Sequence, residues 1–170
     1  AFAEMVTRRL RALKMNVWFD KDRENRDETR TLSSGDTRKI EKSRAMLVLW
    51  SKDADESDWV HAAARTGRSA TRDWVKKSKK DGMLIQTAID DVVPRDPFHV
   101  DQRIELDGLT ARKIVPGFSA LAGALGVSQG RKGLDKWVGF GAKQKDEKDA
   151  WLAKYADDPL SGGTAAKASA

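Results

Sequence analysis

Two continuous apolar runs constrain the fold of this chain more than any other feature of its sequence. Residues 45–50 (AMLVLW) and 83–89 (MLIQTAI) are apolar almost throughout, whereas a strand with one face in water alternates apolar and polar side chains. Such runs are typical of strands covered on both faces, as in a parallel sheet. Between them, small apolar residues from Trp59 onward predict a helix that continues to about Arg72. The order of strand, helix and strand predicts an α/β domain with a doubly wound sheet.

Shorter patterns predict the remaining elements. Apolar side chains at three- and four-residue steps predict a first helix from Phe2 to Leu13, with a stop at Lys14–Asn16. We expect further strands at 16–20 and 104–106, further helices at about 37–44 and 118–126, and loops at 51–58 and 90–97. The charged stretch 20–36 offers almost nothing apolar to bury, so we expect a mobile surface loop there.

The composition of the chain changes after Gly126. Gly, Lys and Asp dominate residues 127–170, so we predict one domain over 1–126 and a basic C-terminal extension, irregular or helical, over 127–170. Residues 137–140 and 150–152 are too apolar for a pure linker and favour a docked helix or a partner-binding segment. The last ten residues are small and polar, and we expect them to be disordered.

Composition excludes several kinds of site. The chain has no cysteine and two histidines, His61 and His99, so disulfides, thiolate sites and histidine-rich metal sites are not expected. No apolar run is long enough to span a bilayer and no signal peptide opens the chain, which favours a cytoplasmic protein without membrane contact. The net charge is +6, but the one dense basic cluster, at residues 76–80, lacks interleaved aromatic side chains, so we expect no direct binding of nucleic acid.

Five segments, in order, resemble the bacterial TIR (Toll/interleukin-1 receptor) family. They are Asn16-Val17-Trp18-Phe19-Asp20, Leu32-Ser33-Ser34-Gly35-Asp36, Ser43 to Ser51, Ser57-Asp58-Trp59-Val60-His61, and Ala88-Ile89-Asp90-Asp91 with Pro94 and Phe98 behind. The resemblance covers the first helix to about Gly126. It implies a flavodoxin-like parallel sheet with helices on both faces. The family's first strand precedes the helix that opens this sequence, so we expect either a fragment or a strand that was not recorded.

The resemblance also implies an activity. TIR enzymes cleave NAD⁺, which is their substrate and not a cofactor, to nicotinamide and ADP-ribose or its cyclic form. They carry a Trp-x-x-x-Glu pattern, which Trp59 matches, but Ala63 stands where the family has its catalytic glutamate. A carboxylate there stabilises the oxocarbenium-like ribosyl cation. Alanine cannot, so we expect this chain to be catalytically disabled.

Two explanations of Ala63 stay open. It is the natural residue of a TIR domain kept for association alone, or an engineered replacement of glutamate; the run Ala62-Ala63-Ala64 and the enzyme-like flanks favour the second. The principal hypothesis is therefore an NAD⁺ nucleosidase of bacterial antiviral defence, switched on by a sensor. The alternative is a non-enzymatic scaffold that acts through self-association or partner association. A receiver-like signalling domain is a third hypothesis, but the acidic phosphoacceptor cluster it needs is missing.

The resemblance assigns four further residues to the NAD⁺ site: Trp59, Ser51, Phe19 and Asp36. Each has a simpler alternative: a core-edge aromatic for Trp59, a helix N-cap for Ser51, a loop anchor for Phe19 and helix capping for Asp36. The loop at about 21–36 would border the cleft and mediate contacts between TIR domains. We expect no metal site, because Asp90-Asp91 is better explained as a strand-end turn.

Overall fold

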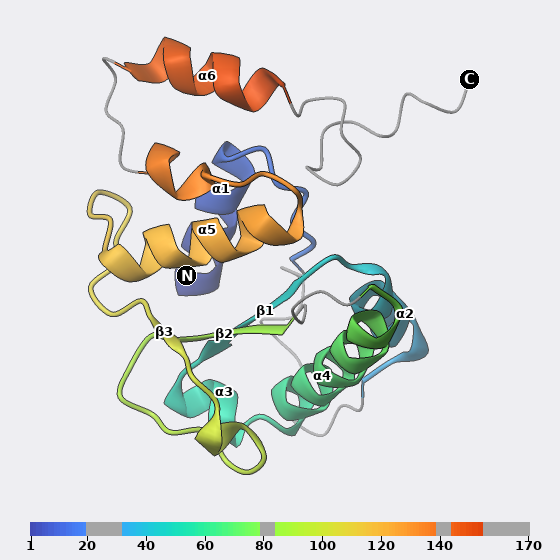
Figure 1. Ribbon diagram of the computed structural model, residues 1–170. Coiled ribbons are helices and arrows are strands. Elements are labelled where there is room, and N and C mark those ends of the chain that lie inside the picture. Colours follow the sequence, from blue (N-terminus) through green and yellow to red (C-terminus); the bar gives the residue numbers. More distant parts are fainter. Residues whose placement is uncertain (20–31, 79–83, 139–143, 155–170) are drawn as a thin grey trace. The chain divides into compact units, whose positions relative to one another are not determined.

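The structure is a computed structural model that describes residues 1–19, 32–78, 84–138 and 144–154 (Figure 1). Contacts within the chain divide it into two units. One unit holds residues 24–108, and the other combines residues 1–23 with residues 109–170.

A three-stranded sheet forms the centre of the unit 24–108. Strands β1 (Met46–Trp50), β2 (Leu84–Ala88) and β3 (Ile104–Glu105) are parallel and lie in the order β1-β2-β3. The register pairs Met46 with Leu84 and Trp50 with Ala88. The two continuous apolar runs therefore form neighbouring parallel strands, as predicted, and the short strand at 104–106 is also confirmed.

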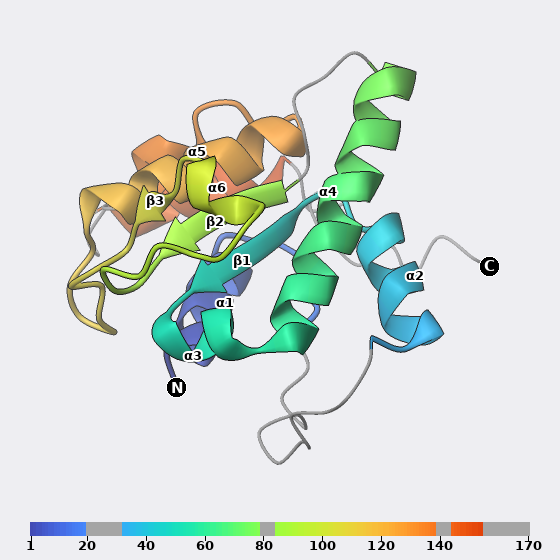
Figure 2. The ribbon, with the colours of Figure 1, turned by 90° about the horizontal axis from the view of Figure 1, so that it is seen from below.

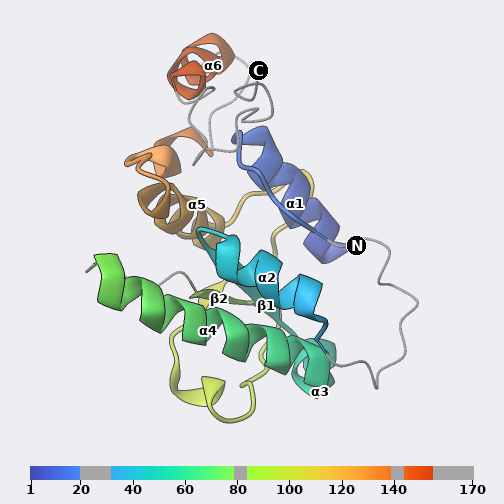
Figure 3. The ribbon, with the colours of Figure 1, turned by 90° about the vertical axis from the view of Figure 1, so that its right-hand side faces the viewer.

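Helix α4 (Asp58–Ser78) connects β1 to β2 and packs against both strands (Figure 2). It also packs against α2 (Ser34–Lys42), which runs beside it in Figure 3. The core joins the sheet to α4 through Val48, Trp50, Ala64 and Phe98, all at most 3% exposed. Phe98 comes from η2 (Phe98–Val100), a 3-10 turn inside the segment between β2 and β3.

Two details of this unit differ from the sequence prediction. The expected loop 51–58 contains a short helix, α3 (Lys52–Glu56), because the Ser51 hydroxyl caps it by accepting the Ala54 N–H at 3.1 Å. Helix α2 begins at Ser34, earlier than the predicted 37, because Ser33 and Asp36 form a reciprocal capping box. The predicted mobile loop thus ends before Ser33, and its residues 20–31 lie outside the described part of the chain.

The second unit begins with α1 (Phe2–Ala12), which ends where the sequence predicted. The Lys14 N–H donates to the Arg11 carbonyl and the Met15 N–H to the Leu10 carbonyl, which is a Schellman motif. Lys14 takes the left-handed conformation that this cap requires, with φ of 60°. The side chain of Met15, the residue after Lys14, is buried, as is usual for an apolar residue at this position of the motif.

The unit continues with α5 (Pro116–Ser128), the 3-10 turn η3 (Leu134–Trp137) and α6 (Lys145–Ala153). Helix α5 runs two residues past the predicted end at Gly126. At Gly126, a Cβ would lie 2.8 Å from the Arg131 carbonyl oxygen and 2.9 Å from the Leu134 Cβ. The chain after α5 therefore folds back closely on it, and a hydrogen atom at this Cα permits that approach.

The predicted strand 16–20 is wrong for residues 16–19, which form no regular structure; Asp20 lies outside the described residues. The Val17 carbonyl accepts from the Arg11 guanidinium at 2.7 Å, so a side chain satisfies it and not a neighbouring strand. Trp18 is 44% exposed. Three apolar residues between Asn16 and Asp20 cannot form a stable strand without a paired neighbour.

Helix α6 lies in the predicted C-terminal extension, and the Trp151 ring packs against Trp137 with centroids 5.9 Å apart. The last ten residues and the side chains of the cluster at 76–80 lie outside the described part. No helix in the described ranges is long and apolar enough to cross a membrane.

Candidate functional site

The carboxyl end of β1 leads directly into the predicted site. Ser51 follows Trp50, and its Oγ is occupied as the N-cap acceptor of α3. Its simpler predicted role is therefore confirmed. Ser57 performs the same function one helix later, because its Oγ accepts the Val60 N–H at 3.3 Å at the start of α4.

Trp59 and Ala63 lie on the first two turns of α4. A spacing of four residues places them on one face of the helix. Trp59 is half-buried, whereas Ala63 is only 1% exposed. Gly67, one turn further on the same face, lies so close to the sheet that a Cβ there would meet the Met46 sulfur at 2.6 Å. Position 63 therefore belongs to the packed side of α4, and its alanine offers neither charge nor hydrogen bond.

Asp55, near the end of α3, accepts hydrogen bonds from Arg95 and His61 through both its carbonyl and its carboxylate. Its carbonyl oxygen accepts from Arg95 Nε at 3.0 Å, from Arg95 Nη2 at 2.7 Å and from His61 Nε2 at 3.0 Å. Its Oδ1 accepts from the Arg95 backbone N–H at 2.7 Å and from His61 Nε2 at 3.0 Å. Asp55 thus ties α3, the first turns of α4 and the loop after β2 together.

His61 is buried at the centre of this arrangement, with 2% exposure. Both oxygens near Nε2 can only accept, so Nε2 carries the proton. The ring lies against two aromatic rings, with centroids 5.0 Å from Trp50 and 5.8 Å from Phe98. Nδ1 is buried and accepts no hydrogen bond from any described residue. The His61–Asp55 pair therefore orients α4, and its enclosed Nδ1 offers no route to a substrate.

The charged state of Asp55 is stabilised. Partial burial acts to raise the pKa of its carboxyl, but the Arg95 backbone N–H, the His61 hydrogen bond and the nearby charges outweigh it and hold the pKa below the usual 3.8. A depressed carboxyl pKa contributes stability that is complete above the unfolded value and is lost as the pH falls through the folded value.

Replacement of Asp55 by asparagine (D55N) should therefore lower the free energy of unfolding by about 2 kcal/mol at neutral pH. The uncharged amide oxygen accepts weaker hydrogen bonds from Arg95 and His61 than the carboxylate does. The difference between parent and variant should begin to shrink below about pH 4, where the carboxyl of the unfolded parent takes up a proton, and should disappear once the pH falls below the lowered pKa of the folded state. Urea titrations at pH 7, 5 and 3 measure this. A difference that stays constant across these pH values would show that the charge is immaterial.

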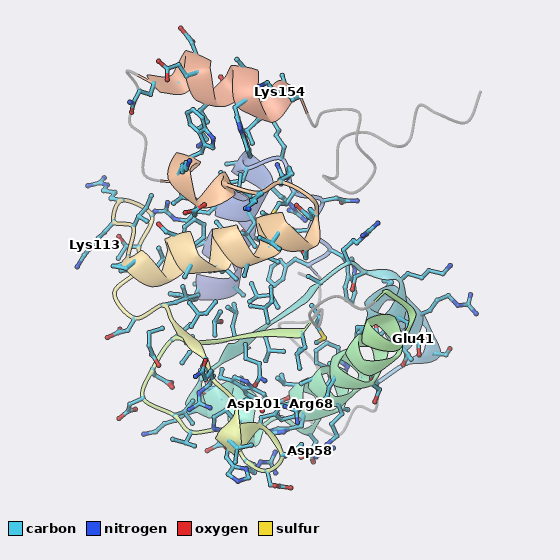
Figure 4. The ribbon with its side chains drawn as sticks, in the orientation of Figure 1. Glu41, Asp58, Arg68, Asp101, Lys113 and Lys154 are labelled. Carbon is cyan, nitrogen blue, oxygen red and sulfur yellow. The ribbon has the colours of Figure 1, made fainter. Side chains whose placement is uncertain are left out.

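A second network of hydrogen bonds involves Trp50, whose ring contacts His61 and Phe98. Trp50 Nε1 donates to Gln86 Oε1 at 2.9 Å, and Gln86 Nε2 donates to Asp101 Oδ2 at 2.6 Å. Asp101 pairs with Arg68 of α4, which Figure 4 labels beside it. The Arg68 guanidinium lies over the Phe98 ring, 4.5 Å from its centroid. Sequence reasoning missed this network because its members lie up to about 50 residues apart.

The local environment of Asp36 explains this residue without a ligand. Asp36 is 4% exposed, and its carboxylate accepts from the Ser33 N–H as part of the α2 capping box. Phe19 is half-buried in the irregular segment that belongs to the other unit. Ser51, Trp59 and Ala63 therefore lie on the segment that runs from the end of β1 through α3 into α4. Asp36 lies on α2, which packs against α4.

The loops at the carboxyl ends of β1 and β2 are acidic. Asp90 is a turn residue, as predicted, because its Oδ1 accepts the Val92 N–H and its Oδ2 accepts the Lys52 N–H, both at 3.0 Å.

More acidic than basic side chains are exposed on these loops. The exposed bases are Lys52 and Arg95, and the exposed acids are Asp53, Glu56, Asp58, Asp91 and Asp96. Such a rim favours positive charge in a bound molecule and opposes phosphates. In the described part of the chain, no three acidic or histidine side chains gather as metal ligands.

Comparison with known protein families, with curated proteins and with solved structures finds no match for this chain.

Proposed function

We propose that this chain has the flavodoxin-like TIR framework of an NAD⁺ nucleosidase and that it is inactive as it stands because position 63 is alanine. The observation that carries the proposal is the position of Trp59 and Ala63. They lie on the first two turns of the helix that follows the carboxyl end of a parallel strand. Ligands of open α/β sheets bind at this edge.

The chemistry at this position requires a carboxylate. The bond between the nicotinamide nitrogen and the ribose carbon breaks, nicotinamide takes the electron pair, and the ribosyl group becomes cationic. A glutamate at 63 would stabilise that cation before water, or the adenine ring in the cyclic product, attacks it. The acidic loops support a positive reaction centre but oppose the pyrophosphate of NAD⁺. Trp59 would stack on the nicotinamide or its ribose, while Ser51 and Asp36 serve as helix caps.

The alternative is a TIR scaffold that works by self-association or partner association. The specific observation in its favour is the 1% exposure of Ala63, since a small side chain suits this packed position. In both proposals the protein is a cytoplasmic signalling component of bacterial antiviral defence that assembles with copies of itself or with a sensor. The two proposals differ in whether restoring a carboxylate restores chemistry.

The test compares the parent chain with A63E and A63Q by nicotinamide release from NAD⁺ at high protein concentration. Because position 63 is buried, A63Q is the matched control for the cost of a larger side chain. We expect A63E to exceed both others by about 10²–10³ in rate, the effect of one well-placed electrostatic group. W59A in the A63E background should abolish the gain. If folded A63E and A63Q are equally inactive, the scaffold proposal replaces the enzyme proposal.

A further inference from the structure

A cavity of about 300 Å³ lies between β2 and the start of β3, within the unit 24–108. The two strands pair only at Thr87 with Ile104 and at Ala88 with Glu105, so the first three residues of β2 have no partner in β3. The cavity borders these three residues, whereas the candidate site lies at the carboxyl ends of the strands. The residues that line the cavity are Leu84, Ile85, Gln86, Gln102, Arg103 and Ile104.

The backbone N–H of Gln86 is an unused donor on this side of β2. The Ala88 carbonyl oxygen accepts the Leu106 N–H at 2.8 Å, so Ala88 bonds toward β3. Alternate residues of a parallel strand bond to the same neighbour, and Gln86 therefore also presents its N–H toward β3. No carbonyl in the described ranges accepts that N–H, although Gln86 is only 8% exposed. An unpaired N–H in such a position is rare and marks a place for an acceptor.

Arg103 supplies the charged group of the cavity and is half-buried. Its Nη1 donates to the Asp101 carbonyl oxygen at 3.0 Å and to the Phe98 carbonyl oxygen at 3.4 Å, which fixes the guanidinium. Its Nε and Nη2 donate to no residue in the part of the chain that the structure describes. These two nitrogens form the edge of a guanidinium that binds a carboxylate through two parallel hydrogen bonds.

The other walls of the cavity are mainly apolar. Three half-buried aliphatic side chains contribute to them, those of Leu84, Ile85 and Ile104. None of the six lining residues is acidic. The carboxylate of Asp101 is close in sequence, but it is already paired with Arg68, which Figure 4 labels beside it. The cavity therefore favours a molecule that has one negative group and one apolar group.

We infer that this cavity binds a small carboxylic acid with a branched apolar side chain. Arg103 binds the carboxylate, the Gln86 N–H donates to an oxygen of the ligand, and the aliphatic walls contact the apolar side chain. The volume is at the lower end of the roughly 300–1,000 Å³ that is usual for ligand sites, which fits a ligand of this size. The inference is independent of NAD⁺ cleavage and of residue 63.

Two kinds of molecule share this chemistry. One is a free small acid. The other is the C-terminal residue of a peptide, whose preceding residues would lie as an extended strand along the part of β2 that β3 does not cover.

The test is a titration of the ¹⁵N-labelled full chain with N-acetyl-leucine, followed by nuclear magnetic resonance. The backbone N–H of Gln86 and the Nε–H of Arg103 should shift and saturate, with a dissociation constant of about 1–10 mM for so small a ligand. N-acetyl-leucinamide has the same apolar group without the charge and should bind at least tenfold more weakly. This comparison uses the parent chain alone, so it does not depend on the stability of any variant.

Substitution of Arg103 tests the residue itself. R103Q should weaken the binding of N-acetyl-leucine at least tenfold, and R103K should recover only part of the loss, because lysine keeps the charge but lacks the planar fork. The matched control R38Q removes an exposed arginine of α2 in the same unit and should change the affinity less than twofold. Circular dichroism of each variant excludes unfolding as the cause of a loss.

A five-residue peptide that ends in leucine distinguishes the two kinds of ligand. Binding at least tenfold tighter than that of N-acetyl-leucine supports a peptide C-terminus, and equal affinity supports a free acid. The inference is overturned if neither the Gln86 nor the Arg103 signal saturates, if acid and amide bind equally, or if R103Q and R38Q lose the same affinity. It is also overturned if inorganic phosphate binds as tightly as N-acetyl-leucine, since the apolar walls would then contribute nothing.

Discussion

Replacement of Arg131 by alanine (R131A) is expected to lower the free energy of unfolding by about 3 kcal/mol, the order of loss when hydrogen bonds from a buried charged group are removed and an acceptor is left unsatisfied. Arg131 is 0% exposed. Its Nη1 donates to the Leu13 carbonyl oxygen at 2.7 Å, and its Nη2 donates to Gln129 Oε1 at 3.0 Å. Leu13 is the C-cap residue of α1, so the arginine connects the end of that helix to the chain that follows α5.

The physical reason is that the Leu13 carbonyl would lose its donor in a buried position and the long side chain would leave a cavity. Chemical denaturation of R131A measures the loss. R131K is the informative control, because lysine keeps the charge but cannot donate in two directions from a planar group. It should recover less than half of the lost stability. Amide exchange at Met15, whose N–H closes the Schellman motif, should accelerate in both variants.

The same contacts make a prediction for truncation. A chain that ends at Gly126 would lose both Arg131 and Leu134, which are each 0% exposed. It should fail to unfold cooperatively. A stable R131A variant, or a truncated chain with the parent's denaturation midpoint, would mean that residues 127–138 are an appendage.

Replacement of Phe98 by alanine (F98A) should cost about 3–5 kcal/mol, the range for a large aromatic side chain in a core. Phe98 is 0% exposed, and its ring lies 5.3 Å from Trp50 and 5.8 Å from His61 between centroids. It is the fully buried side chain that the segment between β2 and β3 contributes to the core cluster, and Val92 of the same segment packs against that cluster. Its loss should release this segment from α4 as well as lower stability.

The conservative variant F98L separates volume from ring chemistry. Leucine restores most of the apolar contact but not the aromatic face beneath the Arg68 guanidinium, so we expect a residual loss of about 1–2 kcal/mol. The denaturation midpoints of both variants test this. If F98L is as unstable as F98A, the ring contacts outweigh volume; if both match the parent, the core assignment fails.

The fold of the unit 24–108 was largely predictable from local patterns. Apolar runs at 45–50 and 83–89 lack the alternation of a strand with one face in water, which favours strands of a parallel sheet, and they pair as parallel neighbours. Capping by Ser51 and the turn at Asp90 follow the same logic, since side chains bond to the backbone two or three residues away. The strand expected at 16–20 failed because strands are stabilised by partners, which a local pattern does not reveal.

The position of the candidate site in the sequence was predictable, but the side chains that surround it were not. The resemblance selected Trp59 and Ala63 as neighbours on a helix, and α4 contains both. It did not indicate that Asp55, His61 and Arg95 would join there, because Arg95 lies 40 residues from Asp55. Neither residue type nor spacing encodes such a contact; it exists only because parallel strands bring their following loops to one edge.

The sequence by itself determined the α/β class, the three strands of the sheet to within one residue at each end, and the absence of a carboxylate at position 63. These depend on side-chain polarity and on interactions within a few residues. Only the tertiary structure decided that Arg131 is buried with its guanidinium on the Leu13 carbonyl, and that Arg9 of α1 donates to the Thr110 carbonyl. Contacts across about 100 residues arise from the packing of whole elements, and no local pattern carries that information.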